Sequence, residues 1–246
     1  LVAQAIERGI NYFDVAPTYG NAQERLGPAL QPYRKDVFLA CKTEQRTKAE
    51  AWAQLQESLR LLRTDHLDLY QLHAMTTLEE VDQVSAPDGA MAAFEDARRQ
   101  GLVRYLGFSA HSEAAALALM ERYPFDSILF PFNYVTWHHG FGPRVLQAAE
   151  GKGVARLALK ALARRPWHED EQREWPKCWY RPVASFAEAQ LALRFTLGLP
   201  ITAAVPSGHP ELLWWACDIA DKLTPLTPAE QEQLKMSALE LQPIFQ

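Results

Sequence analysis

Apolar runs alternate with amphipathic segments along the whole chain. The runs are rich in Val, Ile, Leu and Phe and lack a strict apolar–polar alternation, which is typical of parallel strands covered on both faces. We predict seven such strands, at Ile10–Val15, Val37–Lys42, Leu67–His73, Val103–Ala110, Ser127–Asn133, Val154–Ala161 and Ile201–Ser207.

Between these runs, apolar residues recur at helical spacing. Trp52, Leu55, Leu59 and Leu62 form one apolar stripe, with polar residues on most of the other faces. Gly101 follows another predicted helix and is placed as its C′ residue. Strands that alternate with helices in this way predict right-handed βαβ units.

The number of strands bears on the architecture. A closed TIM (β/α)8 barrel needs eight strands, one more than the sequence provides. The first residues, with Val2, Ala5 and Ile6, already resemble the end of a helix running to Gly9. We therefore predict a single TIM-barrel domain over residues 1–246, with its first strand missing from this sequence.

The segment Arg164–Arg181 differs from the rest because it mixes aromatic residues with charges and prolines. We interpret it as a long loop after the strand Val154–Ala161. Loops after strands shape the active-site mouth of a TIM barrel. Its aromatic residues either line a substrate pocket or pack on neighbouring helices.

Composition and charge limit the classes of partner that the chain is expected to bind. The chain has 246 residues and a net charge of −5, which gives no general attraction to nucleic acid or to anionic membranes. No apolar stretch reaches the ~20 residues of a membrane span. The three cysteines, Cys41, Cys178 and Cys217, have no CxxC spacing and favour a reducing compartment. We expect a cytoplasmic protein, although the natural N-terminus is not seen and an export signal stays open. The oligomeric state is also open.

Four ionisable side chains lie at or just after the ends of predicted strands. Asp14, Lys42 and His73 end three successive strands, and Tyr19 follows Asp14 by five positions. The carboxyl ends of barrel strands form the active-site face, so these side chains are expected to converge.

These residue types fit the reduction of a carbonyl, which needs a proton on oxygen and a hydride on carbon. Tyr19 is the proton donor in this interpretation, and a nearby Lys42 is expected to lower its pKa. Asp14 can hold Lys42 charged in a desolvated site. His73 can donate a hydrogen bond to the substrate oxygen.

Long stretches of the chain resemble the aldo-keto reductase superfamily. Gly9–Gly20 is similar to the first signature of that family, Leu59–His73 to its second, and Gly101–Ser109 to its fifth strand. The resemblance implies a catalytic tetrad of Asp14, Tyr19, Lys42 and His73. It also implies NADPH, with NADH as the alternative, no metal, and a small-molecule carbonyl substrate such as an aldehyde, a ketone or a sugar-like compound.

The same resemblance suggests where the cofactor binds, although the match is weaker there. Ser109 is followed by Ala110 where the family usually has Asn, and His111 can take the place of that residue. The basic residues that usually hold the 2′-phosphate are not evident, so NADPH is implied by the family alone. The predicted cofactor residues are Ser109, His111, Asn133, Lys160, Ser207 and Gly208.

Three other functions fit parts of the pattern. Asp14, His73 and His111 could serve a metal-dependent lyase or isomerase, but that interpretation leaves Tyr19 and Lys42 unexplained. A buried Lys42 could form a Schiff base, which Asp14 opposes by stabilising the ammonium. A regulatory subunit that binds the nucleotide without catalysis would also account for the altered cofactor residues.

Overall fold

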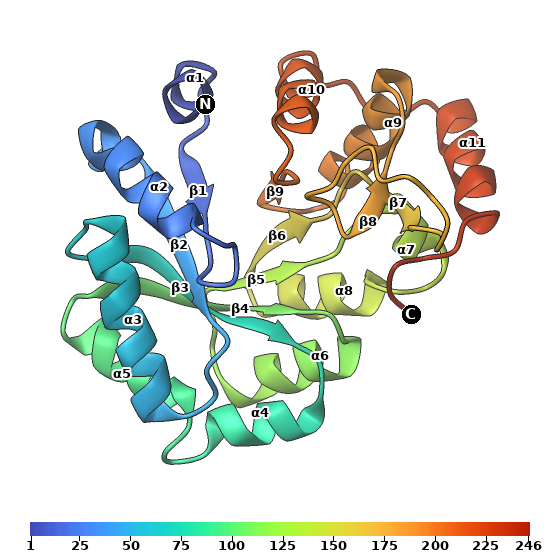
Figure 1. Cartoon of the computed structure of the whole chain (residues 1–246). Helices are drawn as coiled ribbons and strands as arrows, with labels where there is room; N and C mark the ends of the chain where they lie inside the picture. Colours follow the sequence, from blue (N-terminus) through green and yellow to red (C-terminus); the bar gives the residue numbers. More distant parts are fainter. The chain divides into compact units, whose positions relative to one another are not determined.

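Strands and helices alternate along the chain as predicted. The structure, a computed structural model, describes all residues from 1 to 246 and divides into two units, Leu1–Ile128 and Leu129–Gln246 (Figure 1). Each of the seven predicted strands is present. The single domain over residues 1–246 stays a prediction, as does the missing first strand.

The first unit contains four parallel strands in sequential order. They are β1 (Tyr12–Asp14), β2 (Phe38–Thr43), β3 (Leu67–Met75) and β4 (Val103–Ala110). Asp14 is in register with Ala40, and Lys42 is in register with Gln71. Because the strands are parallel, the residues that follow each strand emerge at the same edge.

Helices surround these strands in the first unit (Figure 1). They are α1 (Val2–Glu7), α2 (Ala22–Leu30), a 3₁₀ turn (Gln31–Tyr33), α3 (Lys48–Leu62), α4 (Leu78–Ser85), α5 (Ala90–Arg99) and α6 (Glu113–Arg122). Thr47 and Thr77 cap α3 and α4 by accepting hydrogen bonds from backbone amides of the first turn. Gly101 adopts a φ of 75° after α5, which confirms its placement as the C′ residue.

The strands of the second unit are short. β5 (Ser127–Phe130) crosses the boundary between the units, and β6 (Ala155–Leu159) pairs in parallel with β9 (Ala203–Val205). The predicted strands Ser127–Asn133 and Ile201–Ser207 were therefore too long. The helices are α7 (Tyr134–His138), α8 (Pro143–Gly151), α9 (Phe186–Leu197), α10 (Pro210–Ala220) and α11 (Pro228–Leu239).

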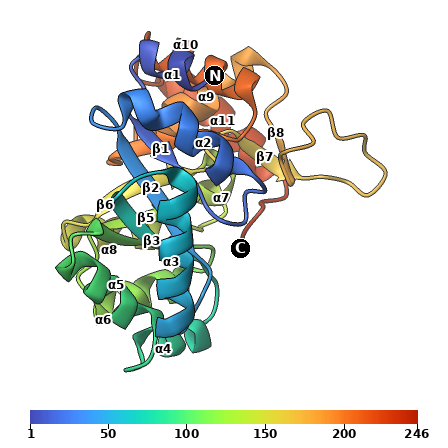
Figure 2. The same cartoon turned by 60° about the vertical axis from the view of Figure 1, so that its left-hand side comes forward.

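The prediction that Arg164–Arg181 is entirely loop was wrong. β7 (Ala163–Pro166) and β8 (Tyr180–Pro182) pair in an antiparallel ladder, and the connection between them is drawn as an extended loop (Figure 2). The loop is held at its base, where Trp167 Nε1 donates to the carbonyl of Cys178 at 2.8 Å. The apolar–polar pattern did not reveal the strands because they are only 4 and 3 residues long.

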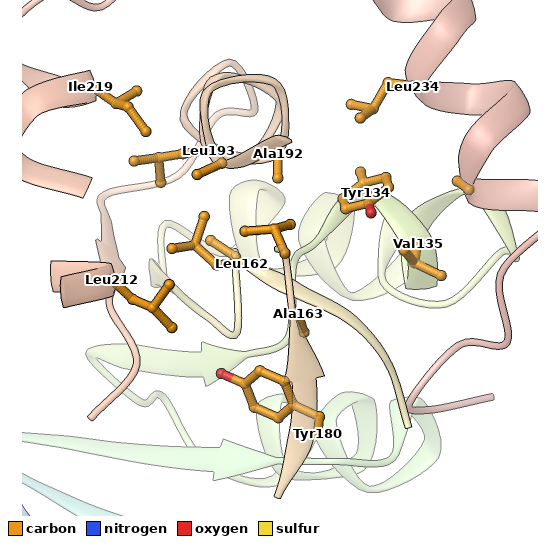
Figure 3. Packing of buried hydrophobic residues seen from close by; sticks show 14 of the residues in the cluster. Tyr134, Val135, Leu162, Ala163, Tyr180, Ala192, Leu193, Leu212, Ile219 and Leu234 are labelled. Carbon is orange, nitrogen blue, oxygen red and sulfur yellow. The ribbon is translucent and has the colours of Figure 1, made fainter. Parts of the chain in front are cut away.

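A hydrophobic cluster holds the second unit together. Its buried residues come from α7, α9, α10, α11 and the β7–β8 hairpin (Figure 3). Trp175 of the hairpin loop packs against this cluster, whereas Trp179 stays exposed. Trp175 therefore fits the interpretation that the segment packs on neighbouring helices. The interpretation that the segment lines a substrate pocket stays a prediction. No helix in either unit has the length and apolar character that a membrane crossing requires.

Gly27 marks a close approach between α2 and α3. A Cβ atom at this position would lie 2.4 Å from the carbonyl oxygen of Leu61 and 2.8 Å from Cα of Leu62. We expect Gly27→Ala to lower the free energy of unfolding by about 2 kcal/mol, because neither backbone can yield without moving a helix. Urea unfolding measures this change.

The matched control is Gly151→Ala at the end of α8, where a Cβ would meet no atom within 4 Å. That variant should be as stable as the parent or slightly more so, since alanine favours helix. Equal stability of the Gly27→Ala variant and the parent would contradict the close packing of α2 on α3.

Candidate active site

A buried ion pair lies at the centre of the first unit. The Nζ of Lys42 contacts Oδ2 of Asp14, and the two side chains are only 1% and 7% exposed. They meet because β1 and β2 are neighbours, with both side chains on the same face. Burial disfavours the charged amine, but the charges of Asp14 and the Tyr19 phenol outweigh it and raise the pKa of Lys42.

Tyr19 lies beside this pair, in the loop after β1. The Lys42 Nζ is 5.1 Å from the centroid of its ring, and 47% of the residue is exposed. Burial around the phenol raises the pKa of Tyr19 above its usual value, while Lys42 lowers it by a smaller amount. The predicted effect of Lys42 is therefore present, but desolvation outweighs it and the net pKa of Tyr19 is raised.

His73 approaches Tyr19 from β3, the strand next to the one that carries Lys42. The two rings are 5.7 Å apart and nearly perpendicular, and Thr18 Oγ1 lies 3.5 Å from Nδ1 of His73. The structure thus brings together all four residues of the predicted tetrad, Asp14, Tyr19, Lys42 and His73.

The backbone that carries His73 is irregular. β3 extends to Met75, past the predicted end at His73, and its pairing with β4 shifts between Leu72 and Met75. Ala74 adopts a left-handed φ of 54°, which costs a non-glycine residue about 1 kcal/mol. Such a conformation persists only where the surroundings enforce it.

Two groups enforce this conformation. The amide of Ala74 donates to Oγ of Ser109 at 2.7 Å, and Nη2 of Arg46 donates to the carbonyl of His73 at 2.8 Å. Arg46 is in turn fixed by Glu80, whose Oε1 accepts from its Nη2 at 2.8 Å. Ser109, predicted as a cofactor residue, therefore also supports the backbone beside His73.

The other predicted cofactor residue of the first unit, His111, directly follows β4. Its amide donates to the carbonyl of Met75 at 2.9 Å, so the irregular end of β3 also fixes this residue. Ser109 and His111 thus lie on the strand adjacent to the one that carries His73.

In the second unit, Asn133 is fully buried and caps α7. Its Oδ1 accepts from the amides of Val135 and Thr136 at 3.1 Å each, and its Nδ2 has no hydrogen-bond partner. An unused donor on a buried amide is costly unless a ligand or solvent accepts from it.

Lys160 follows β6 in a left-handed conformation, with a φ of 62°. Its ammonium lies 5.6 Å from the ring centroid of Trp179 and 5.3 Å from that of Phe245. These distances correspond to cation–π contacts. The exposed Trp179 and the C-terminal segment therefore both contact the predicted cofactor lysine.

Ser207 and Gly208 lie between β9 and the start of α10. The Oγ of Ser207 is buried and has no partner, and Gly208 is exposed. A helix start with available donors suits an anionic group.

Three residues beside the tetrad escaped the sequence-based prediction: Gln71, Arg46 and Glu80. Gln71 Nε2 donates to Oδ1 of Asp14 at 3.1 Å. A signal for Gln71 was present, because it interrupts an apolar run two positions before His73. Arg46 and Glu80 had no such signal, since they meet only in the folded chain.

The metal-dependent alternative needs a cluster of ligands. No group of three or more His, Cys, Asp or Glu side chains is arranged to hold a metal ion. The predicted ligands Asp14 and His73 are instead found beside Lys42 and Tyr19, as described above.

Comparison with known protein sequences identifies related chains. A model of the Aldo/keto reductase family matches residues 1–197. The uncharacterized oxidoreductase YqkF of Bacillus subtilis strain 168 is 32% identical over 147 residues, which are 54% of this chain and 46% of that protein. The aldo-keto reductase YhdN of the same strain is 29% identical over 177 residues, or 66% of this chain and 51% of that protein. The chain spans about half the length of these two relatives.

Solved structures agree on the fold. The holo form of the aldo-keto reductase AKR11C1 from Bacillus halodurans superposes with a TM-score of 0.72 at 23% identity, covering 99% of this chain and 87% of that one. The Bombyx mori aldo-keto reductase AKR2E4 in complex with NADP gives a TM-score of 0.71 at 19% identity, covering 96% and 81%. These similarities confirm the predicted (β/α)8-barrel fold class.

Glu80 gives this region a predictable pH dependence. Although burial opposes ionisation, hydrogen bonds from Arg46 and Thr76 lower the pKa of Glu80 from 4.5 to about 2. A depressed folded-state pKa stabilises the protein above pH 4.5, and this stabilisation is lost as the pH falls towards 2. We expect Glu80→Gln to lower the free energy of unfolding by about 2 kcal/mol at pH 7, and by less at pH 3.

Urea unfolding at several pH values between 3 and 7 tests this expectation. The matched control is Glu79→Gln, on the exposed neighbouring position of α4. A loss that does not change with pH, or an equal loss in the control, would contradict the proposed linkage.

Proposed function

Because this chain belongs to the aldo/keto reductase family, we propose that it is an NAD(P)H-dependent oxidoreductase that reduces an aldehyde or ketone to an alcohol, with Tyr19 as the proton donor. The observation that carries the proposal is the buried Asp14–Lys42 pair next to an exposed tyrosine and a histidine. The substrate is a small carbonyl compound, sugar-like compounds included.

Each of the four residues has a separate task in this proposal. The carbonyl oxygen of the substrate lies between the hydroxyl of Tyr19 and the ring of His73. Tyr19 gives its proton to that oxygen, and His73 donates a hydrogen bond that orients it. Lys42 stabilises the phenolate that remains, and Asp14 keeps Lys42 charged.

The charge state of Lys42 also speaks against a Schiff-base enzyme. Such an enzyme needs a neutral amine as its nucleophile, usually with a depressed pKa. Asp14 and Tyr19 instead raise the pKa of Lys42 despite its burial. Lys42 is therefore better suited to stabilise negative charge than to attack a carbonyl.

The cofactor, when bound, supplies the hydride that reduces the carbonyl carbon. We assign its binding to Ser109 and His111 in the first unit and to Asn133, Lys160, Ser207 and Gly208 in the second. The unpartnered donor of Asn133 and the unpartnered hydroxyl of Ser207 fit a nucleotide, which is rich in acceptors. The NADP complex of the silkworm relative supports NADPH, and NADH is the alternative.

In this proposal, the state of the cysteines indicates the cellular compartment in which the protein acts. Cys41 and Cys178 are buried thiols outside any disulfide. Free thiols persist in a reducing environment, which supports the cytoplasm as the place of action.

A fluorescence titration tests cofactor binding directly. The seven tryptophans should be quenched as NADPH or NADH is added, and saturation at micromolar concentrations is expected. The preferred nucleotide is the one with the lower Kd. An intact chain that binds neither nucleotide would refute the reductase function.

Substitution of the proton donor tests the mechanism. Tyr19→Phe should reduce kcat by about 100-fold or more, because it removes only the proton donor. The Kd for the nucleotide should stay within about twofold. Turnover of a panel of aldehydes and ketones with NADPH measures the change in kcat, and the fluorescence titration measures the Kd.

Tyr105→Phe is a matched control, since Tyr105 is also in the first unit and is 47% exposed. Its kcat should equal that of the parent. Unchanged turnover in the Tyr19→Phe variant would rule out Tyr19 as the donor.

A further inference from the structure

Gln71 is a fully buried polar residue that the four-residue mechanism does not use. It lies on β3, in register with Lys42 on β2. Side chains along a strand alternate between faces, so Gln71 shares its face with Leu69 below and His73 above. It therefore lies one pleat beneath the proposed proton-transfer site.

The orientation of its amide is fixed by chemistry. An ionised carboxylate only accepts hydrogen bonds, so the nitrogen of the amide must face Asp14. Nε2 of Gln71 donates to Oδ1 of Asp14 at 3.1 Å, while Lys42 contacts Oδ2. Each carboxylate oxygen thus has its own donor, from a different strand.

Packing alone does not explain a glutamine at this buried position. Its Oε1 is buried and has no partner, a cost that an apolar side chain of similar volume would avoid. Buried carboxylates need every oxygen satisfied when only one cation is near. The hydrogen bond to Asp14 supplies what the ion pair lacks.

We propose that Gln71 is a positioning residue that holds Asp14 towards Lys42 and thereby sets the acidity of Tyr19. Gln71 does not touch the phenol and acts through Asp14. Without it, Asp14 is free to rotate about its χ2 angle, and Lys42 loses a fixed counter-charge. A carboxylate that is held less firmly neutralises the ammonium less, so the ammonium stabilises the phenolate more and the pKa of Tyr19 falls. This inference rests on the proposed function only in giving Tyr19 a catalytic task.

Several ionisable groups affect the pKa of the Tyr19 phenol, and the test has to separate their effects from that of Gln71. They are Asp14 and Tyr12 on β1, Cys41 and Lys42 on β2, and His73 on β3. Of these groups, Asp14 is the one that accepts a hydrogen bond from Gln71. A double-mutant cycle with Asp14→Asn therefore isolates the effect that passes through the carboxylate.

The experiment measures the pKa of Tyr19 by NMR in protein labelled with ¹³Cζ-tyrosine. The chain has eight tyrosines, and the Tyr19 signal is the one absent from the Tyr19→Phe variant. We expect Gln71→Met, which keeps the volume, to lower the pKa of Tyr19 by about one pH unit. In the Asp14→Asn background, the same substitution should have no further effect. Leu69→Met, on the same face of β3, should leave the pKa unchanged.

Gln71→Leu provides a second variant should Gln71→Met fail to fold. It removes the donor to Asp14 without adding a charge, so it should also lower the pKa of Tyr19. An unchanged Tyr19 pKa in a folded Gln71 variant would overturn the proposal. So would an equal shift with Asp14→Asn present, or the same shift in Leu69→Met, since both indicate general loosening of β3.

The test of Gln71 does not depend on the reductase function, because the NMR measurement needs no turnover. Failure of nucleotide binding or of the Tyr19→Phe prediction would refute the function and leave the role of Gln71 intact. Where turnover is measurable, Gln71→Met should lower kcat by about tenfold and move the alkaline limb of its pH profile downwards. The Kd for the nucleotide should not change.

Discussion

The ion pair between Asp14 and Lys42 is the constraint on which the rest of the first unit depends. Two charges removed from water lose several kcal/mol of hydration each, and only close contact with full hydrogen bonding offsets that loss. The contact requires β1 beside β2, in a register that brings the two side chains to one face. The second carboxylate oxygen requires β3 as well, through Gln71. The parallel order of three strands is thus directly tied to the chemistry.

Burial also decides the acid–base character of the site. Desolvation raises the pKa of Tyr19 more than Lys42 lowers it, so the phenol keeps its proton at neutral pH. That state is the one a proton donor needs before reaction. Lys42 stays charged for the opposite reason, because the attraction of its neighbours, Asp14 above all, outweighs its burial. Under the proposed function, the site therefore combines a protonated acid with a fixed positive charge that stabilises the anion formed after proton transfer.

Backbone strain and its supports complete the arrangement. The left-handed Ala74 sets the direction of the chain beside His73, and Ser109 and Arg46 hold it from two sides. In the second unit, Lys160 has a similar left-handed conformation and contacts two aromatic rings. Both residues follow or end strands, where the proposed function places substrate or cofactor. Strain at such positions is common in functional sites because the surrounding structure fixes it.

The sequence by itself predicted the strands, their parallel character and the convergence of Asp14, Tyr19, Lys42 and His73, because these depend on local composition and on ordered motifs. The position of each of the seven strands followed from unbroken apolar runs, and Gly101 from its place after a helix. Only the tertiary structure decided the β7–β8 hairpin, the irregular backbone at Ala74 and the partners of Gln71, since none of these leaves a pattern along the chain. The net shift in the pKa of Tyr19 was also decided by the tertiary structure. It is a balance between desolvation and the field of Lys42, and both depend on distances between residues that are remote in sequence and meet only on folding.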